Sequence, residues 1–495
     1  MNSAVVSEIK GNKFFWIIVA VSALIFFVCQ YQKLGYSPDD TYIYLKYSKN
    51  ISEGYNFSFN KEEPSYGVTG PLWALILVIP FWLGIDPFWF AKSLDLIFIV
   101  LSFFIFFKFT GFFFKDNITF RLCALSVFVL NPLITRSTFT GMETSFALFM
   151  VLLSFYLFYS NRLYWAFFVM GFGMLVRPEI FVLIGVLGLS LYVRNYREKK
   201  SFYVPVKYVL CAVVIVIPFW IFAYMTFGTV ISNTSIGKSV LRFDIWNQLA
   251  NAWQILRLYF FFGPAEVILF AAGSFFVILK KKYHMLPLIM WVAGLLALYI
   301  VSSSAVMSRY LVIIYPFTVI VALKFIEIIP SLKKVIFVLL IAVCLFYSQL
   351  VFYKHVKPYS EGFTAGINEC LIPAGKWIES NVPDGNKVLV NDVGAIGFYT
   401  NKYIIDAAAL INRDLELNRK ILSVPNYEKE NPHLMLNFIR TDYLVEKDTA
   451  ANFTKRVAGN FELVLLKSFV FRQMWVLDPR PQYFTIYKVN RLNPK

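Results

Sequence analysis

Two adjacent carboxylates, Asp39 and Asp40, follow the first hydrophobic segment, in the run Tyr36-Ser-Pro-Asp-Asp-Thr-Tyr-Ile-Tyr44. Neighbouring like charges raise each other's pKa, and a carboxylate near hydrocarbon favours its neutral form. Because the chain is 58% hydrophobic and has only 30 acidic residues, stability alone gives little reason to place two of them together at a membrane boundary. Carboxylates held there can deprotonate a hydroxyl as a general base, or bind a cation that neutralises a phosphate.

The composition indicates what kind of protein holds this pair. A mean hydropathy of +0.61 and 53 Phe in 495 residues are typical of a polytopic membrane protein rather than of a soluble core. The net charge is +17, but the basic residues cluster in short loops between apolar runs. That pattern orients a membrane protein, so we expect a lipid bilayer as partner and no nucleic acid.

Twelve segments are apolar enough to be considered as membrane spans. An amino-terminal signal-anchor with its first residues in the cytoplasm, and a carboxyl terminus outside, require an odd number of crossings. We therefore expect eleven, with one of the short segments 71–84 and 119–135 not crossing. The segments are 14–31, 71–84, 91–114, 119–135, 142–160, 163–177, 178–194, 204–227, 259–279, 285–303, 308–328 and 334–353.

The composition changes after Tyr353. Polar turns at 383–385 and 478–479 alternate with β-rich runs at 387–391 and 461–466 and with helical patterns at 373–381 and 429–440. The expected fold is thus a polytopic α-helical membrane domain, residues 1–355 with a first outer loop at 32–70, followed by an extracytoplasmic (periplasmic) α/β domain, residues 356–495.

Residues 40–51 read as a short helix lying in the membrane interface, with Tyr42, Leu45 and Ile51 on one face and Lys46, Lys49 and Asn50 on another. Asp39 and Asp40 would then lie at its amino terminus, where acidic residues are favoured. Capping is the structural interpretation of the pair. One Asp satisfies a cap, however, so the second favours chemistry.

Several classes of site find no support in the sequence. The five Cys suggest no disulfide framework, the three His have no metal-ligand spacing, and no Gly-rich phosphate loop is present. A nucleotide-dependent site on the outer face is therefore disfavoured. A lipid-phosphate donor fits an outer-face carboxylate better.

Segments in the first outer loop, residues 39–60 and 66–73, resemble the corresponding loop of GT-C glycosyltransferases, and most closely bacterial relatives of the mycobacterial wall arabinofuranosyltransferases. Thr41 stands where that pattern has Ala, and Val68-Thr-Gly70 where it has Tyr-Thr-Ser. Further matches follow in the same order along most of the chain. They are Thr140-Gly-Met-Glu-Thr144, Val176-Arg-Pro-Glu179, residues 227–238, Ser308-Arg-Tyr-Leu311, and residues 390–399 with 405–410.

The resemblance implies the GT-C fold and an inverting transferase that uses a polyprenyl-phosphate-linked sugar, with a catalytic Asp in the first outer loop. Within it we interpret Asp39 as the general base, and Asp40 as a residue that orients the acceptor or holds a divalent cation (Mg, Mn or Ca); the two roles could be exchanged. A cation is a candidate and not a requirement. The acceptor would be a cell-envelope glycan or lipid, and the location a bacterial cytoplasmic (inner) membrane.

Other residues are candidates for supporting roles. Arg309 and Lys238 are placed to bind the donor phosphate, although Arg309 is equally well interpreted as a membrane-edge anchor. We expect Glu143 and Arg177 to form a structural salt bridge rather than to act directly in catalysis. We expect Asp95, which lies close to Lys92 in the sequence, to serve in helix packing. Three more residues are candidates for acceptor contact or structural support: Asn233, Asn391 and Asp392, the last two favouring a turn.

Two other functions remain open. A flippase or transporter for a lipid-linked glycan would want charges at mid-membrane depth and often an internal repeat, and here the charges concentrate at one face without a repeat. A ligase or polymerase that moves a preassembled glycan from its carrier is a third possibility that is also compatible with the sequence. Asp39→Asn is the discriminating substitution, and sugar and acceptor are left open.

Overall fold

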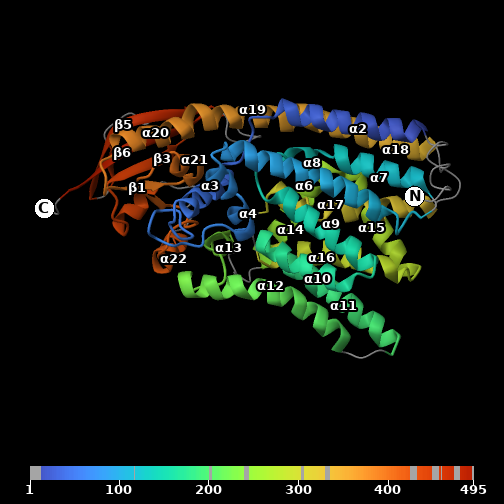
Figure 1. Cartoon of the computed structure of the whole chain (residues 1–495). Coiled ribbons are helices and arrows are strands. Elements are labelled where there is room, and N and C mark those ends of the chain that lie inside the picture. The colour runs from blue at the N-terminus through green and yellow to red at the C-terminus, as the bar shows by residue number, and fades with distance from the viewer. Residues whose placement is uncertain are drawn as a thin grey trace. The chain divides into compact units, whose positions relative to one another are not determined.

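A computed structural model shows the chain as two compact units, each described here by itself (Figure 1). The helical unit comprises the described residues of 13–34, 92–218 and 245–356, and the mixed unit those of 35–91, 219–238 and 357–492. The structure describes residues 13–115, 117–199, 203–238, 245–302, 306–328, 335–423, 432–448, 456–458, 460–472 and 480–492.

Apolar helices make up the helical unit. Five described helices are long and apolar enough to cross a membrane, or six if the pair α14 and α15, bent by 114°, is one span. The multi-pass class is confirmed, whereas eleven crossings stays a prediction. The helices are α2 (Lys13–Gln32), α6 (Pro87–Thr110), α7 (Ile118–Leu130), α8 (Pro132–Ser137), α9 (Thr144–Tyr159), α10 (Leu163–Val176), α11 (Phe181–Arg197), α12 (Tyr203–Phe227), α14 (Ile245–Phe262), α15 (Pro264–Leu279), α16 (Leu286–Val301), α17 (Tyr315–Ile328) and α18 (Val335–Val351). Residues 87–91 of α6 and 219–227 of α12 belong to the mixed unit.

Both short segments suspected of not crossing are broken helices. Segment 71–84 forms α4 (Pro71–Ile76) and α5 (Ile79–Leu83) in the mixed unit. Segment 119–135 divides between α7 and α8, where Pro132 begins a new helix and Asn131 Oδ1 accepts the Leu133 N–H at 2.8 Å. Proline at the first helical position and a side-chain cap are the usual devices that start a helix afresh.

A six-stranded sheet is the centre of the mixed unit, which confirms a small carboxyl-terminal sheet domain. Its order is β2-β1-β3-β6-β5-β4. β1 is parallel to both β2 and β3, and the remaining pairs are antiparallel. The strands are β1 (Lys387–Val390), β2 (Tyr403–Asp406), β3 (Tyr443–Asp448), β4 (Arg456–Ala458), β5 (Phe461–Phe471) and β6 (Gln482–Arg491).

The parallel strands give the mixed unit a topological switch point. The chain leaves β1 through α21 (Val393–Phe398) to β2, and after α22 (Leu415–Ser423) it returns on the other side of β1 as β3. In open α/β sheets the crevice outside the carboxyl ends of strands at such a point is the usual place for a ligand. Buried apolar residues from the strands and from α22, including Leu389, Ile421 and Leu444, form the core below it.

Most expectations for this region are confirmed. The runs at 387–391 and 461–466 are β1 and the start of β5, residues 373–381 lie in α20 (Ile372–Asn381), and Gly385 has the positive φ of a turn. The expected helix at 429–440 is wrong in its described part, which has only a 3₁₀ helix, η6 (Pro432–Asn437). The turn expected at 478–479 lies outside the described residues.

Candidate functional site

The helix expected over residues 40–51 is confirmed as α3 (Asp39–Ser52), which carries the two carboxylates and is buried along most of its length. Its position in a membrane interface stays a prediction. All residues from Thr41 to Ser48 are buried. Its polar face is used internally: Lys46 Nζ donates to the Thr400 carbonyl at 2.6 Å, and Asn50 Nδ2 donates to the Ser58 and Phe59 carbonyls at 3.0 and 2.7 Å. These polar side chains therefore hold α3 to the rest of the mixed unit.

Asp39 caps a helix other than its own. The amino-terminal cap position of α3 is Pro38, which has no side-chain acceptor. The Asp39 carboxylate instead accepts the N–H of Gly394 at Oδ2 (2.8 Å) and the N–H of Ala395 at Oδ1 (2.7 Å), in the first turn of α21. Gly394 is required for this approach, because a Cβ there would lie 2.1 Å from the Asp39 carbonyl oxygen and 2.6 Å from its Oδ2.

The electrostatic surroundings of Asp39 favour its protonated form. Burial, with the carboxylate of Asp392 and to a smaller extent that of Asp40, raises the pKa of Asp39 to about 7, although the two N–H donors favour the charged form. Each carboxylate oxygen has more than one lone pair, so one N–H bond per oxygen leaves acceptor capacity. A carboxylate with a pKa near neutrality is suited to take a proton from a hydroxyl.

The carboxyl ends of β1 and β3 supply charges near Asp39. Asn391 and Asp392 directly follow β1, and Asp392 Oδ2 pairs with Lys447 Nζ of β3 at 3.2 Å. The structure therefore brings together Asp39 and Asp392, two residues predicted separately and more than 350 positions apart in the chain. Asp40 follows Asp39 in the first turn of α3.

The helical unit gathers a second group of predicted residues. Arg177 forms the expected salt bridge with Glu143, Nη2 to Oε1 at 3.0 Å, and both side chains are buried. The guanidinium also lies over the Tyr310 ring at 4.9 Å, and that of Arg309, in the 3₁₀ helix η3 (Ser308–Leu311), is 5.7 Å from the same ring.

Asp95 belongs to a third cluster. It accepts hydrogen bonds from Thr140 N (2.7 Å), Thr140 Oγ1 (3.2 Å), Gly141 N (3.1 Å) and Ser145 Oγ, and it is fully buried. Its main partners are thus the loop before α9, not the neighbouring Lys92, whose ammonium lies over the Phe139 ring at 4.7 Å. An Asp bonded this way fixes the loop that leads to Glu143.

Two remaining candidates lie near α13 (Asn233–Lys238). Asn233 Nδ2 donates to the Asn412 carbonyl at 2.8 Å, which is the support expected of it. The side chain of Lys238 lies outside the described residues, so its assignment to a donor phosphate stays a prediction. Within the part of the chain that the structure describes, no three His, Cys, Asp or Glu side chains gather as metal ligands, so a cation at Asp40 also stays a prediction.

Sequence reasoning missed several residues of these clusters. Lys33 is buried and donates to the Arg136 carbonyl at 3.3 Å and to the Thr138 carbonyl. Glu179 accepts the Tyr299 hydroxyl at 3.3 Å. Of these two residues only Glu179 could have been found from the sequence, because it lies in the run Val176-Arg-Pro-Glu179, which also contains the candidate Arg177.

A family model matches the carboxyl-terminal part of the chain. Residues 363–487 match a domain of unknown function, DUF8728. No curated protein matches the chain in sequence.

Solved structures resemble the chain over most of its length. ArnT from Cupriavidus metallidurans in the apo state has a TM-score of 0.59 at 12% identity, covering 98% of this chain and 100% of that one. The same protein bound to undecaprenyl phosphate has a TM-score of 0.54 at 12% identity, covering 97% and 99%. The Archaeoglobus fulgidus oligosaccharyltransferase in complex with Zn and sulfate has a TM-score of 0.52 at 13% identity, covering 79% of this chain and 62% of that one.

At sequence identities of 12–13%, the similarity to these structures shows a shared fold and nothing more. It extends from the membrane helices through the sheet domain, because ArnT is covered almost end to end. The chain therefore has the GT-C fold that the sequence predicted.

Proposed function

We propose that this protein is an inverting membrane glycosyltransferase. It moves a sugar from a polyprenyl-phosphate donor to a cell-envelope glycan or lipid on the outer face of a bacterial cytoplasmic membrane. The observation that carries the proposal is the fold shared over the whole chain with ArnT, a protein whose structure holds undecaprenyl phosphate. The closer resemblance to arabinofuranosyltransferases rests on sequence segments alone, so the transferred sugar is a pentose or a hexose.

Asp39 acts as the general base in this proposal. An acceptor hydroxyl gives its proton to the Asp39 carboxylate while its oxygen bonds to the anomeric carbon. The bond from that carbon to the phosphate oxygen breaks, and the polyprenyl phosphate leaves with the electron pair. A single displacement inverts the anomeric centre. The pKa of about 7 supports this role at neutral pH, since a base is most effective when its pKa lies near the working pH.

The other predicted residues take supporting roles. Asp40 orients the acceptor or holds a divalent cation, and Arg309 and Lys238 compensate the charge of the leaving phosphate. Glu143 and Arg177 form a structural ion pair, because their charged atoms are bonded to each other.

The experiment uses the full chain in liposomes that also contain envelope lipids and glycans extracted from a deletion strain as acceptors, with a panel of undecaprenyl-phosphate sugars: glucose, galactose, mannose, arabinofuranose and 4-amino-4-deoxyarabinose. We expect release of undecaprenyl phosphate from at least one donor, and loss of one envelope sugar in a deletion strain by mass spectrometry. If no donor is consumed and the envelope glycans of the deletion strain are unchanged, the proposal is wrong.

A second candidate is transfer of a preassembled glycan. The fold shared with an archaeal oligosaccharyltransferase favours it. The two functions differ in the mass added to the acceptor, one sugar against a whole oligosaccharide, and the same mass spectra separate them.

A further inference from the structure

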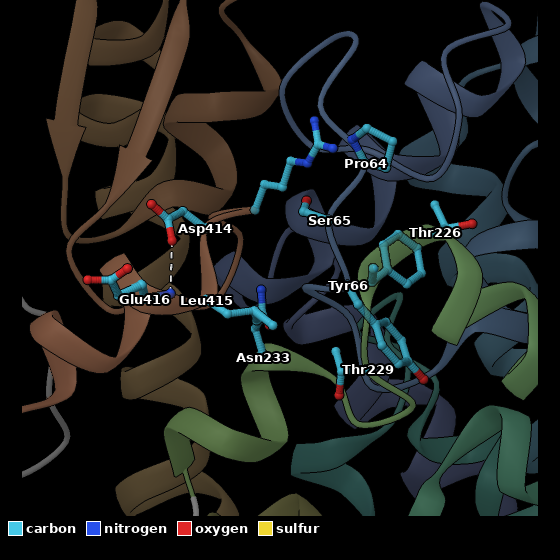
Figure 2. Close-up of a pocket in the computed structure, with 11 residues that line it drawn as sticks. Pro64, Ser65, Tyr66, Thr226, Thr229, Asn233, Asp414, Leu415 and Glu416 are labelled. Atoms are coloured by element: carbon cyan, nitrogen blue, oxygen red, sulfur yellow. Dashed lines mark hydrogen bonds between the residues drawn. The ribbon is translucent and has the colours of Figure 1, made fainter.

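A cavity of about 370 Å³ lies within the mixed unit, apart from the contacts of Asp39 (Figure 2). Its volume falls in the range of small-molecule sites, roughly 300–1,000 Å³. Three segments distant in sequence line it: residues 64–66 of the first outer loop, residues 226–233 from the end of α12 to the start of α13, and residues 413–416, which lead into α22. The lining residues are Pro64, Ser65, Tyr66, Thr226, Phe227, Thr229, Asn233, Arg413, Asp414, Leu415 and Glu416.

The loop that follows β2 is held in shape before any ligand binds. The buried Asp406 carboxylate accepts the N–H groups of Ala408, Leu410 and Ile411 at 2.7, 2.7 and 3.2 Å. Asn412 closes the loop, since its Oδ1 accepts the Asp406 N–H at 2.8 Å and its Nδ2 donates to the Asp406 carbonyl at 2.9 Å. A preformed wall lowers the entropic cost of binding.

One wall of the cavity is aromatic and the other is charged. Tyr66 and Phe227 stack nearly parallel, with ring centroids 5.4 Å apart and 22° between the planes. Figure 2 shows Tyr66 and Thr229 on one side and Asp414, Leu415 and Glu416 on the other. Apolar rings facing a few converging polar groups are the composition of a small-molecule site.

The charged groups retain capacity for a ligand. Arg413 forms no hydrogen bond or ion pair with the residues that the structure describes. Asp414 uses one oxygen, Oδ1, to accept the N–H groups of Glu416 and Leu417 at 2.8 and 3.1 Å, which leaves its Oδ2. Glu416 contacts Lys420 at 2.9 Å in an exposed pair that solvent weakens.

The balance of charge excludes some ligands. The lining contains one guanidinium and two carboxylates, so a phosphate would meet net repulsion. Asp414 also already occupies the amino terminus of α22, where an anion would otherwise bind. Sugar hydroxyls donate to carboxylates and accept from a guanidinium, and the apolar face of a sugar ring suits an aromatic wall.

We propose that this cavity binds a neutral or amino sugar residue of the acceptor, and so selects which glycan receives the transferred sugar. The inference rests on the proposed function, of which it specifies the acceptor. Arg413 and Glu416 make the selecting contacts.

A direct measurement of sugar binding tests the proposed site independently of transferase activity. The probes are methyl glycosides of glucose, galactose, mannose, glucosamine and glucuronic acid, observed by saturation-transfer NMR on the full-length protein in detergent micelles. We expect a neutral or amino sugar to bind, and Arg413→Gln or Glu416→Gln to weaken it about tenfold or more, as loss of a charged hydrogen bond does. Arg419→Gln, an exposed Arg of α22 outside the cavity lining, is the matched control and should leave binding unchanged.

A kinetic arm uses the acceptor identified in liposomes. Arg413→Gln should raise the acceptor KM and leave the donor KM unchanged. Equal binding by wild type and both variants, binding of no methyl glycoside by wild type, or a preference for inorganic phosphate or anionic lipid vesicles that Arg413→Gln abolishes, would each overturn the inference. If sugars bind as expected but no donor is consumed, the proposed function fails and the sugar site stands.

Discussion

Asp39 in the mixed unit and Asp95 in the helical unit make the same kind of contact in different surroundings. Each accepts backbone N–H groups from a distant segment. Asp95 has four donors and lies among buried lysines, Lys33 and Lys92. Asp39 has two donors and lies near two other carboxylates. The comparison teaches that neighbours decide the role: a carboxylate saturated by donors and cations holds structure, whereas one with spare lone pairs among like charges can exchange a proton.

Asp39→Asn should have the largest effect. Loss of the general base lowers kcat by about 10²–10⁴-fold. An amide can also accept only one of the two N–H groups, so a stability loss of about 1–3 kcal/mol accompanies it. Transfer per folded molecule, with thermal unfolding in parallel, separates the two effects. Asp40→Asn is the matched variant in the same helical turn: if it abolishes turnover while Asp39→Asn does not, the base assignment is wrong.

Asp95→Ala should act on stability instead. It leaves buried donors in residues 140–145 unpaired and removes the carboxylate near two buried lysines, at a cost of about 3–5 kcal/mol. The yield of folded protein and its thermal unfolding temperature measure this. Asp86→Ala is the control, since the exposed Asp86 side chain accepts the Trp89 N–H in an exposed bond, and its loss should cost about 0.5–2 kcal/mol. Equal losses in the two variants would contradict the comparison.

Gly394→Ala should displace Asp39 without altering any carboxylate. The added Cβ collides with Asp39, and misplacement of a catalytic group by about 1 Å costs up to about 100-fold in rate. Losing two N–H donors that favour the charged form also raises the pKa of Asp39 further. The acid limb of kcat/KM should therefore move to higher pH, which a merely structural role of Gly394 would not cause.

The pH dependence of the wild type tests the same base without any substitution. The base must be ionised, so with the pKa of Asp39 at about 7 kcat/KM should fall about tenfold per pH unit below neutrality. The free energy of unfolding should change in the opposite direction. Between about pH 4 and pH 7 the folded state keeps Asp39 protonated, whereas the unfolded state, in which the Asp39 pKa is near 4, has released that proton. The mixed unit should thus be more stable at pH 5 than at pH 8. A flat rate profile between these values would remove Asp39 from proton transfer.

The sequence predicted the elements better than the contacts between them. Membrane helices, β1 and β5 follow from apolar runs and β-rich patterns, and Asp39 and Asp40 are conspicuous as charges in an apolar chain. The capping of α21 by Asp39 could not be predicted, because its partners lie 355 and 356 positions away and their backbone N–H groups have no sequence signature. The burial of α3 was missed for a similar reason, since Lys46 and Asn50 look solvent-exposed until their carbonyl partners are known.

The cavity was missed altogether. Arg413, Asp414 and Glu416 form an ordinary charged run in the sequence, and only the folded loop after Asp406 sets them opposite Tyr66. Asn233 was selected through a resemblance, and its bond to the Asn412 carbonyl gives that choice a physical basis.

The arrangement of the three parallel strands has an evolutionary consequence. β1, β2 and β3 end at one edge of the sheet, where Asp392, residues 407–414 and Lys447 follow or close them. Ala407, Ala409 and Asn412 are buried and hold the loop after β2 in place, whereas Arg413, Asp414 and Glu416 are exposed. Under the proposed function, a lineage can therefore change the glycan it modifies by replacing residues 413–416 while keeping the strands. Descendants of one ancestor should diverge fastest at these positions and slowest in β1.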